Sequence, residues 1–423
     1  MKHRSWLLLA LSVSSPVFAD FEYHGYMRSG FGYADGQNDQ VCFKGLPGEQ
    51  MKTLRLGNEC DTYVEQNLVN IQKLENGMTA RGAITFALAS DGHKLWESTN
   101  GKALDVSLEE AYVELDKLPI EGTRIWVGKR FNRQDIYLTD KYYEENNGPG
   151  AGIMGLPLFG DAKAHVILVR NVPDEGPGQS NLDVKLEGVG LLGGSLSARL
   201  IYGYVPELAR KDKAGALQQY KGLDGQRYTL EYQIPVANGF ARATLQRGDD
   251  LFGGTNLDQF GAWGTQNVKT DEALQQRQAS SATRGILFAV VQPLSSLSVG
   301  ALAAYQDADD GSNRRNLTQA QVGVQPIYHF SDHYHLQFAA EWNRIENAIY
   351  SEAEGYGDAE LRKLTIAPTL TLKKGFWERP QLRVFVTKAY WNDDLKDRAA
   401  FLADVYPNKT EGTSGGFQFE AWW

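Results

Sequence analysis

Histidines are the side chains in this sequence best suited to metal or acid-base chemistry, and three of the seven lie close together at His329, His333 and His335. Imidazole is a common ligand of transition metals, and His333 and His335 would share one face of a strand. However, no cysteine or well-spaced carboxylate completes a ligand set. We therefore predict a turn rich in interfacial residues here, with no metal and no cofactor.

Two glycine-containing strings match catalytic motifs by letters but lack the structural context that those motifs need. GVGLLG at 188–193 matches a dinucleotide-binding pattern, yet the alternating segment SLSARLIYGYV follows where a helix should begin. GTSGG at 412–416 matches a nucleophile elbow, but neither a helix nor a histidine follows it. We interpret the first as a hairpin turn and the second as a loop that leads into the last strand. The sequence predicts no catalytic residue and no enzyme.

A different pattern places single aromatic residues among polar ones on one face of a strand. With a period of two, the chain end GGFQFEAWW separates Phe417, Phe419 and Trp423 from Gln418, Glu420 and Trp422. The segment DFEYHGYMRSGFGY, which begins at Asp20, alternates in the same way. It places Phe21, Tyr23 and Met27 on one face and Glu22, His24, Tyr26 and Arg28 on the other. In TYVEQNL, Tyr63 and Glu65 again share a face.

Aromatic side chains on a face in contact with water require an explanation, because burying each of them elsewhere would be favourable by roughly 1.5 to 3 kcal/mol. Sugars supply one, since a pyranose stacks its apolar CH face on a ring. Its hydroxyls can bond to arginine and carboxylate side chains nearby. A series of rings flanked by ionic residues would let a sugar chain move along without a single deep energy well. The alternative for any one ring is a filler residue or a membrane-interface residue.

The elements that carry these residues are strands of about 8 to 12 residues, a length that suits tilted membrane strands. Examples are RIWVGKR (124–130), AHVILVR (164–170), RYTLEYQI (227–234), TRGILFAVV (283–291) and QLRVFVTKAYW (381–391). Tight connectors occur at Asn76-Gly77, Asn238-Gly239, 292–295, 331–332 and 373–375. Long polar connectors lie near 34–53, 91–105, 132–151, 172–180, 206–224, 248–281, 307–316, 347–360 and 393–412. This alternation of short and long connectors is typical of an up-and-down barrel.

Nine long connectors imply 18 strands if both chain ends lie on the periplasmic side. Seventeen strands are clear from the sequence, and parity then requires one more at 152–160, which contains Pro157 and precedes a turn at 160–163. The fold class that we predict is all-β, an 18-stranded antiparallel transmembrane barrel at residues 20–423. A soluble β-sandwich or propeller is the alternative, but it explains the leader sequence and the aromatic last strand less well.

The first 19 residues have the layout of a cleavable secretory signal, with Lys2 and Arg4 before an apolar stretch and Ala19 before Asp20. Without Lys2 and Arg4, the 43 basic residues fall to 41 against 52 acidic ones, so a duplex nucleic acid is not expected as a partner. No later stretch approaches the roughly 18 apolar residues of a spanning helix. If the chain crosses a membrane, a closed barrel must do so.

The two cysteines, Cys42 and Cys60, are an even count in a chain with an export signal, which favours one disulfide. A free pair or a metal site is the alternative.

These segments together resemble the maltoporin family of outer-membrane sugar channels, from Asp20 to Trp423. The strongest stretches are HGYMRSGFGY, RLGNECDTYVE (55–65), GKRFNRQDIYLTDKYYEENNGPGAG (128–152), RPQLRVFVTKAYW (379–391) and the terminal WW. The resemblance implies a homotrimeric barrel in the outer membrane of a Gram-negative bacterium, with an inward-folded third loop. Its partners would be lipid and maltose or maltodextrins.

The resemblance also implies roles for individual residues. The family's aromatic slide corresponds to Tyr26, Tyr63, Trp96, Trp391 and Trp422, with Trp96 reaching into a neighbouring subunit. Tyr142 corresponds to the constriction, and Arg28, Arg55, Arg133, Asp135 and Asp140 correspond to an ionic track. The family's loop disulfide corresponds to Cys42 with Cys60.

Two positions depart from the family pattern. A sixth slide aromatic falls on or near Ala243, and a lumenal arginine aligns with Glu109. These departures favour keeping open a sister porin for sucrose, raffinose-type sugars or β-glucosides. An outer-membrane barrel enzyme and a surface adhesin or phage receptor are further alternatives. On the period of two, Trp422 should face the lumen and Trp423 should face lipid.

Overall fold

The computed structural model describes most of the chain after residue 18. The described residues are 19–36, 39–47, 49, 51–91, 97–99, 103–139, 141–173, 176–211, 215–254, 268–311, 316–351, 355–396, 398, 401–402 and 404–423. The expected signal peptide lies outside them apart from Ala19, and so do Trp96 and Asp140. Within these ranges, no helix is long and apolar enough to cross a bilayer.

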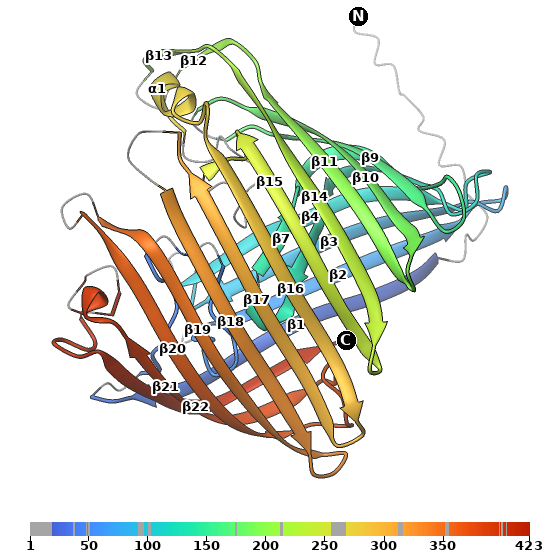
Figure 1. Cartoon of the computed structure of the whole chain (residues 1–423). Coiled ribbons are helices and arrows are strands. Elements are labelled where there is room, and N and C mark those ends of the chain that lie inside the picture. Colours follow the sequence, from blue (N-terminus) through green and yellow to red (C-terminus); the bar gives the residue numbers. More distant parts are fainter. Residues whose placement is uncertain are drawn as a thin grey trace, which may run out of the picture.

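Eighteen strands form one antiparallel sheet that closes on itself, because β1 pairs with both β2 and β22. The first strand (blue) and the last strand (red) therefore lie side by side (Figure 1). The barrel strands are β1 Ala19–Ala34, β2 Thr62–Lys73, β3 Thr79–Ser90, β4 Leu104–Asp116, β5 Arg124–Arg130, β8 Gly148–Pro157, β9 Lys163–Asn171, β10 Gln179–Leu191, β11 Gly194–Val205, β14 Leu223–Val236, β15 Gly239–Asp250, β16 Ser281–Leu294, β17 Leu297–Asp309, β18 Asn316–His329, β19 Tyr334–Ser351, β20 Gly355–Leu370, β21 Gln381–Trp391 and β22 Glu411–Trp422. The predicted 18-stranded barrel is confirmed.

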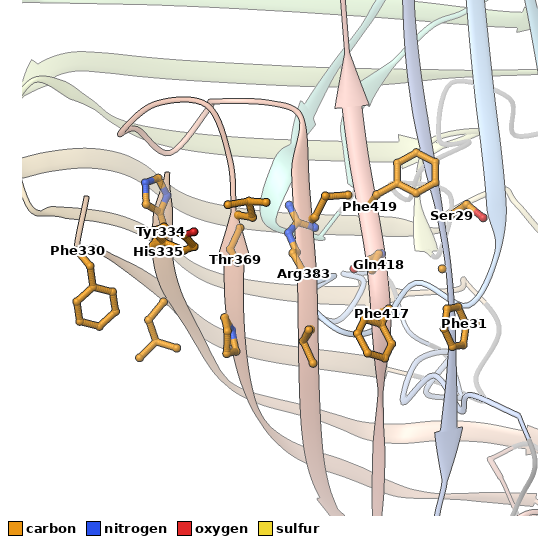
Figure 2. A pocket seen from close by; sticks show the side chains of 16 residues that line it. Ser29, Phe31, Phe330, Tyr334, His335, Thr369, Arg383, Phe417, Gln418 and Phe419 are labelled. Atoms are coloured by element: carbon orange, nitrogen blue, oxygen red, sulfur yellow. The ribbon is translucent and has the colours of Figure 1, made fainter. Parts of the chain in front are cut away.

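Side-chain alternation explains why these segments form barrel strands. In β21, Leu382, Val384 and Val386 are exposed on the outer face, whereas Arg383 and Phe385 are buried on the inner one. An outer surface of this kind suits lipid. Figure 2 shows part of it, an apolar groove in which Phe31 of β1 lies beside Phe417 of β22, with ring centroids 5.4 Å apart.

The strand required by parity is present as β8, which ends at Pro157 and is followed by a short connector at 158–162. GVGLLG is confirmed as a hairpin, since Leu192 and Gly193 connect β10 to β11 with positive φ. GTSGG was predicted as a loop, but it is part of β22 and pairs with both β21 and β1. Small residues there let neighbouring backbones approach, as at Gly416, where a Cβ would lie 2.2 Å from the carbonyl oxygen of Phe31.

Long and short connectors alternate as predicted, with three local differences. The turn between β14 and β15 consists of Ala237 and Asn238, both at positive φ, rather than Asn238-Gly239. The strands around 347–360 run further than predicted, so β19 and β20 are separated only by 352–354. The expected tight turn at 373–375 belongs to a ten-residue connector, 371–380, whose Phe376 packs in the interior core.

The barrel interior is filled mainly by two long connectors, 35–61 and 131–147. The second contains a small sheet of β6 Arg133–Ile136 and β7 Lys141–Glu145, joined through the 3₁₀ turn η1 Tyr137–Thr139. Met51, Leu54 and Leu138 from these connectors pack against inward wall residues such as Phe288 and Phe385. The inward fold of the third loop is confirmed, whereas the similar fold of the first connector was not predicted.

The described parts of the outer connectors contain further elements. They are a hairpin of β12 Leu208–Lys211 and β13 Leu217–Tyr220, the short helix α1 Asp271–Gln275 and the 3₁₀ turn η3 Asp393–Leu395. Leu274 of α1 and Tyr220 of β13 pack with Phe252 in a core beneath these connectors.

Candidate functional site

A polar cavity of about 460 Å³ lies inside the barrel, between the walls of β1, β2 and β22 and the inward connector 131–147. It brings together most of the residues that the resemblance singled out. The lining residues are Tyr26, Arg28, Arg55, Tyr63, Glu65, Glu109, Phe131, Arg133, Asp135, Tyr137, Tyr142, Glu145, Asn147 and Trp422.

Three aromatic rings line one side of this cavity because their strands are neighbours and their positions point inward. Tyr26 of β1 lies opposite Trp422 in the register of β1 and β22. Its ring centroid is 6.0 Å from that of Tyr63 on β2. Tyr137 of η1 meets Trp422 edge-on, with centroids 6.1 Å apart and planes at 89°. Strands and connector together build a continuous aromatic surface.

Glu420 lies beneath Tyr26 and Tyr137 of the cavity wall, and its side chain is completely buried. Its carboxylate pairs with Arg55 at 2.9 Å, Arg379 at 2.8 Å and Arg383 at 2.6 Å. It also accepts hydrogen bonds from the hydroxyls of Tyr26 and Tyr137 at 3.0 and 2.7 Å. Three guanidinium groups compensate for this buried charge, and they hold the phenol groups in fixed positions.

The other cations of the cavity are also paired and lie beside rings. Arg28 bonds to Glu59 at 2.9 Å and to Asp61 at 2.8 Å. Arg133 lies 3.5 Å from Glu65, and its guanidinium carbon is 4.2 Å from the centroid of the Tyr142 ring. Ring faces and ionic groups therefore alternate over short distances, as a polyhydroxylated solute with apolar CH faces requires.

The connector 131–147 is fixed to the wall opposite the cavity. Arg199 of β11 bridges Glu144 of the connector at 2.7 Å to Asp183 of β10. Tyr143 donates its hydroxyl hydrogen to Glu231 at 2.6 Å, and Gln246 donates to its backbone carbonyl at 2.9 Å. These buried contacts hold Tyr142 and Arg133 in the cross-section of the barrel.

Glu145 lies where this connector borders the cavity. Burial raises its pKa to about 7, although the positive charges of Arg133 and Lys141 oppose this shift. Asn147 donates a hydrogen bond to one carboxylate oxygen at 2.6 Å, and the other oxygen is buried without a partner. The charge of this side chain therefore changes near neutral pH.

Glu109 also lines the cavity, so its side chain is within reach of a solute there. It lies at an irregularity of β4, where Glu110 pairs with Thr85 and Leu108 pairs with Phe86, so Glu109 itself has no register partner on β3. A β-bulge of this kind redirects a side chain. Its carboxylate faces the same cavity as Arg133.

Trp391, a predicted slide residue, is not brought to this cavity. Its side chain is 7% exposed and packs against Phe43, Phe401 and Tyr406 beneath the outer connectors. Its Nε1 donates to the carbonyl of Lys409 at 3.0 Å. These rings leave little of the indole open to a solute, so the stacking role of Trp391 stays a prediction from the family resemblance. Trp96 and Asp140 lie outside the described residues.

Sequence reasoning missed Phe131 and Tyr137 of the cavity lining, and it also missed two further aromatic residues on the interior side. Trp377, in the connector 371–380, is 42% exposed and lies 5.3 Å from Tyr137 between ring centroids. Phe240 of β15 meets Phe288 edge-on, whereas Ala243 is exposed on the outer face of the same strand. Ala243 therefore cannot mark a missing lumenal ring. Side chains alternate between the two faces of a strand, so in FARATL Phe240 and Arg242 share one face and Ala243 lies on the other.

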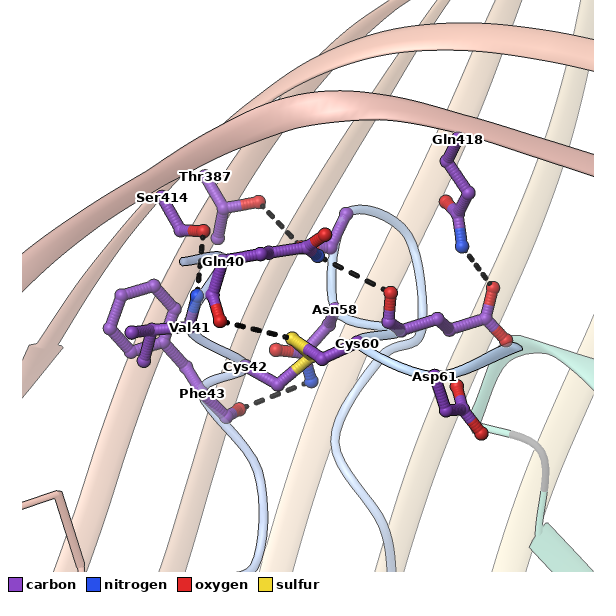
Figure 3. The surroundings of a disulfide bond; sticks show 12 residues. Gln40, Val41, Cys42, Phe43, Asn58, Cys60, Asp61, Thr387, Ser414 and Gln418 are labelled. Carbon is purple, nitrogen blue, oxygen red and sulfur yellow. Dashed lines mark hydrogen bonds between the residues drawn. A yellow bond between two sulfur atoms is a disulfide. The ribbon is translucent and has the colours of Figure 1, made fainter. Parts of the chain in front are cut away.

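The predicted disulfide is confirmed between Cys42 and Cys60, which are 18 positions apart (Figure 3). It closes the first connector around Asn58, whose amide donates to the carbonyl of Phe43 at 3.2 Å. In the same segment Glu59 accepts a 2.7 Å hydrogen bond from Gln418 of β22. The bridge thus restrains the segment that presents Arg55 to the cavity and supplies Glu59 as a partner of Arg28.

Comparison with known proteins identifies the family. The LamB porin family matches residues 21–423. The chain belongs to the LamB porin family. A curated relative, the maltoporin of Hahella chejuensis, is 28% identical over 432 residues, covering 98% of this chain and 96% of the relative. This LamB porin is therefore a channel of the Gram-negative outer membrane, and not an enzyme.

Solved structures with a related overall shape include two from Pseudomonas aeruginosa. OpdK has a TM-score of 0.48 at 10% identity and covers 96% of this LamB porin and 99% of its own chain. OccK9 (OpdG) has a TM-score of 0.48 at 11% identity, with coverage of 95% and 98%.

Proposed function

We propose that this LamB porin conducts maltose and maltodextrins by passive diffusion through the cavity described above. The observation that carries the proposal is that Tyr63, Tyr26 and Trp422 line the same cavity as the ionic groups of Arg28, Arg55 and Glu65. A glucose unit can stack on a ring while its hydroxyls exchange partners among guanidinium and carboxylate groups. Tyr142 and Arg133 set the aperture from the opposite side.

The aromatic path extends beyond the cavity toward the end of the barrel with short connectors. Trp377 contacts Tyr137, and Tyr137 contacts Trp422. We include Trp377 in the path for this reason. Asp135 lines the cavity beside these rings, and it belongs to the ionic track of the proposal. The roles of Trp96 and Asp140 rest on family resemblance alone, as does the homotrimer, whereas the cleavage after Ala19 rests on the layout of residues 1–19.

One observation favours a second group of substrates: Glu109 places a carboxylate in the cavity wall. An acidic group near Arg133 changes which hydroxyl patterns bind well, because carboxylates only accept hydrogen bonds whereas guanidinium groups only donate them. Sucrose, raffinose-type sugars or β-glucosides are the alternative substrates.

Ion current through purified channels in a planar bilayer, titrated with a panel of sugars, tests the proposal. Maltodextrins should block the current reversibly and at lower concentration than sucrose, raffinose or cellobiose. If one of the other sugars blocked the current more strongly, that sugar would replace maltodextrin as the proposed substrate. The absence of block by every sugar would contradict a sugar-conducting function.

A further inference from the structure

Two of the three clustered histidines meet edge-on inside the barrel wall, with ring planes at 74°, away from the sugar cavity. His329 is the last residue of β18 and His335 is the second residue of β19, and they are direct register partners. Their side chains are only 2% and 3% exposed, and the ring centroids lie 4.2 Å apart. Figure 2 shows His335 next to the outward residue Tyr334, at one end of the groove. His333 does not join the pair, since its Nδ1 lies 3.2 Å from the carbonyl of Thr371.

The nitrogens of this pair are mostly unpartnered. The Nε2 of His329 lies 2.8 Å from the hydroxyl of Ser298. Its Nδ1 and both nitrogens of His335 are buried and have no partner within hydrogen-bond geometry. The backbone of Ser331 and Asp332 lies close to the His335 ring without meeting that geometry. Buried polar atoms in folded proteins nearly always have partners, so three such nitrogens at one point call for a ligand.

One oxygen beside this turn is also buried and unpartnered, Oγ1 of Thr371. Thr371 is linked to the turn through its amide, which donates to the carbonyl of His333 at 3.0 Å. Among the residues that the structure describes, no third His, Cys, Asp or Glu joins these two histidines as a metal-ligating set. Any further ligands would therefore be neutral oxygens, from water or from side chains of this kind.

We infer that His329 and His335 together bind one divalent transition-metal ion of the class that prefers imidazole nitrogen, such as Cu²⁺, Ni²⁺ or Zn²⁺. Neutral imidazole is the ligand form of histidine. Contact between one ring nitrogen of His329 and Ser298 is the type of outer contact that fixes a ligand's tautomer and orientation. With metal–nitrogen distances of about 2.0 to 2.1 Å, both rings reach one ion when their centroids are roughly 4.5 to 5.2 Å apart. The rings must therefore separate by less than about 1 Å.

A nearby positive charge lowers the affinity of this site for a metal ion but does not prevent binding. The positive charge of Lys374 acts on both histidines and opposes a bound cation. Lys374 lies 3.8 Å from Asp332, which offsets part of its charge. We therefore expect binding in the micromolar range rather than the tight binding of a four-ligand site, because only two strong ligands are present.

The test uses Cu²⁺ as the probe on the full-length, untagged protein after removal of metals with EDTA. Wild-type protein should bind one Cu²⁺ with a dissociation constant below about 100 µM, and its electron paramagnetic resonance spectrum should show two equatorial imidazole nitrogens. His329→Gln and His335→Gln should each leave one such nitrogen and weaken binding at least about tenfold. The matched control His333→Gln, in the same turn, should retain affinity and spectrum.

A second measurement does not depend on the variants folding well. Zn²⁺ should raise the Tm of the wild-type barrel, because an ion that binds only the folded state stabilises it, and EDTA should reverse the increase. The inference is overturned if wild-type protein binds no Cu²⁺ at about 100 µM. It is equally overturned if the double variant His329→Gln/His335→Gln keeps the wild-type spectrum, or if His333→Gln loses binding as the other two do. In any of these cases the pair is a buried structural contact.

Discussion

Trp422 and Trp423 are adjacent in the sequence but lie on opposite faces of the barrel wall. Trp422 lines the cavity and contacts Tyr137, with the guanidinium carbon of Arg379 4.2 Å from its ring centroid. Trp423 is 41% exposed and packs beside Tyr23 on the outer face, with centroids 5.6 Å apart. The period of two therefore assigned both rings to the correct face.

Trp422→Ala should weaken maltohexaose block of the channel while leaving the barrel folded. Loss of one stacking ring costs roughly 1 kcal/mol, which corresponds to about a fivefold rise in the dissociation constant. Trp423→Ala is the matched control, since it removes an adjacent ring of the same size from the outer face. Current-noise titration measures the block, and resistance of the barrel to SDS measures folding. Equal changes in block for both variants would contradict the two-face assignment.

Trp377 and Trp391 offer a second comparison of two tryptophans. Trp377→Ala should weaken block to a similar extent as Trp422→Ala, because its ring extends the aromatic path through Tyr137. Trp391→Ala should leave the block unchanged but destabilise the core beneath the outer connectors, where removing a large buried aromatic costs about 3 to 5 kcal/mol. Sugar titration and protease sensitivity of the connectors distinguish these effects. Loss of block in Trp391→Ala with intact connectors would restore its slide role.

Glu145 should make ion selectivity depend on pH around neutrality. Its pKa is raised to about 7, above the 4.5 of an exposed glutamate, so the carboxyl is neutral well below pH 7 and negative above it. Cation selectivity should therefore rise between pH 6 and pH 8, as measured by the reversal potential in a salt gradient. Because the pKa of Glu145 is higher in the folded state, ionising this side chain destabilises the folded protein. The free energy of unfolding should therefore fall as pH rises from about 4.5 through 7.

Glu145→Gln should remove most of this pH dependence and fix selectivity at the low-pH value. Glu121→Gln is the matched control, because Glu121 is exposed in the short connector 117–123, away from the cavity. A wild-type selectivity that stays constant from pH 6 to pH 8 would show that Glu145 is already charged or lies outside the ion path.

At the scale of elements, the inward connector 131–147 depends on a few buried contacts with the barrel wall. The bridge from Arg199 to Glu144 and Asp183 involves side chains that are almost entirely buried. Removing one partner of such a bridge leaves uncompensated charges, which costs about 3 to 5 kcal/mol. The position of Tyr142, and with it the aperture, is therefore sensitive to residues on the far side of the connector.

Arg199→Met should loosen this connector and increase both single-channel conductance and current noise. The Tm of the barrel should fall as well. Arg362→Met is the matched control, since Arg362 lies on the outer face of β20 and forms an exposed pair with Glu360, worth about 0 to 1 kcal/mol. If the Arg199 variant had the conductance of wild type, the bridge would not position the connector.

Strands were more predictable from the sequence than the connectors that fold inside them. Alternation in QLRVFVTKAYW specified β21 almost to the residue, because lipid and interior impose opposite polarity on successive side chains. The first connector has no comparable period. Its inward fold depends on distant contacts, such as the hydrogen bond from the amide of Met51 to Gln319 at 2.8 Å, and no local pattern encodes these.

Residues of the candidate site on strands were likewise easier to predict than those in connectors. Tyr26, Tyr63 and Trp422 were predictable because each is an aromatic residue in a polar phase of a strand. Trp377 was missed because a tight turn was predicted at 373–375, whereas the connector 371–380 is long enough to pack Phe376 inside the barrel. Trp391 also points inward, but connector residues pack over it, and no local pattern in the sequence predicts that contact.

For the whole molecule, the closed sheet determines the position of the solute path. Closure pairs β1 with β22, so the first and last segments of the chain supply Tyr26 and Trp422 to one wall. The inward connectors fill the remaining interior, which leaves a narrow route rather than a wide pore. Solutes should then be selected by how many ring and ionic contacts they make along that route, and longer linear sugars make more of them.

The dependence of channel block on sugar length tests this account most directly. Maltose, maltotriose, maltotetraose and maltohexaose should be titrated against the ion current of single channels in a planar bilayer, at one salt concentration. The account predicts a dissociation constant that falls steadily with each added glucose unit until the path is filled, with block dominated by slower exit. A dissociation constant independent of chain length, or no block by any of these sugars, would contradict it.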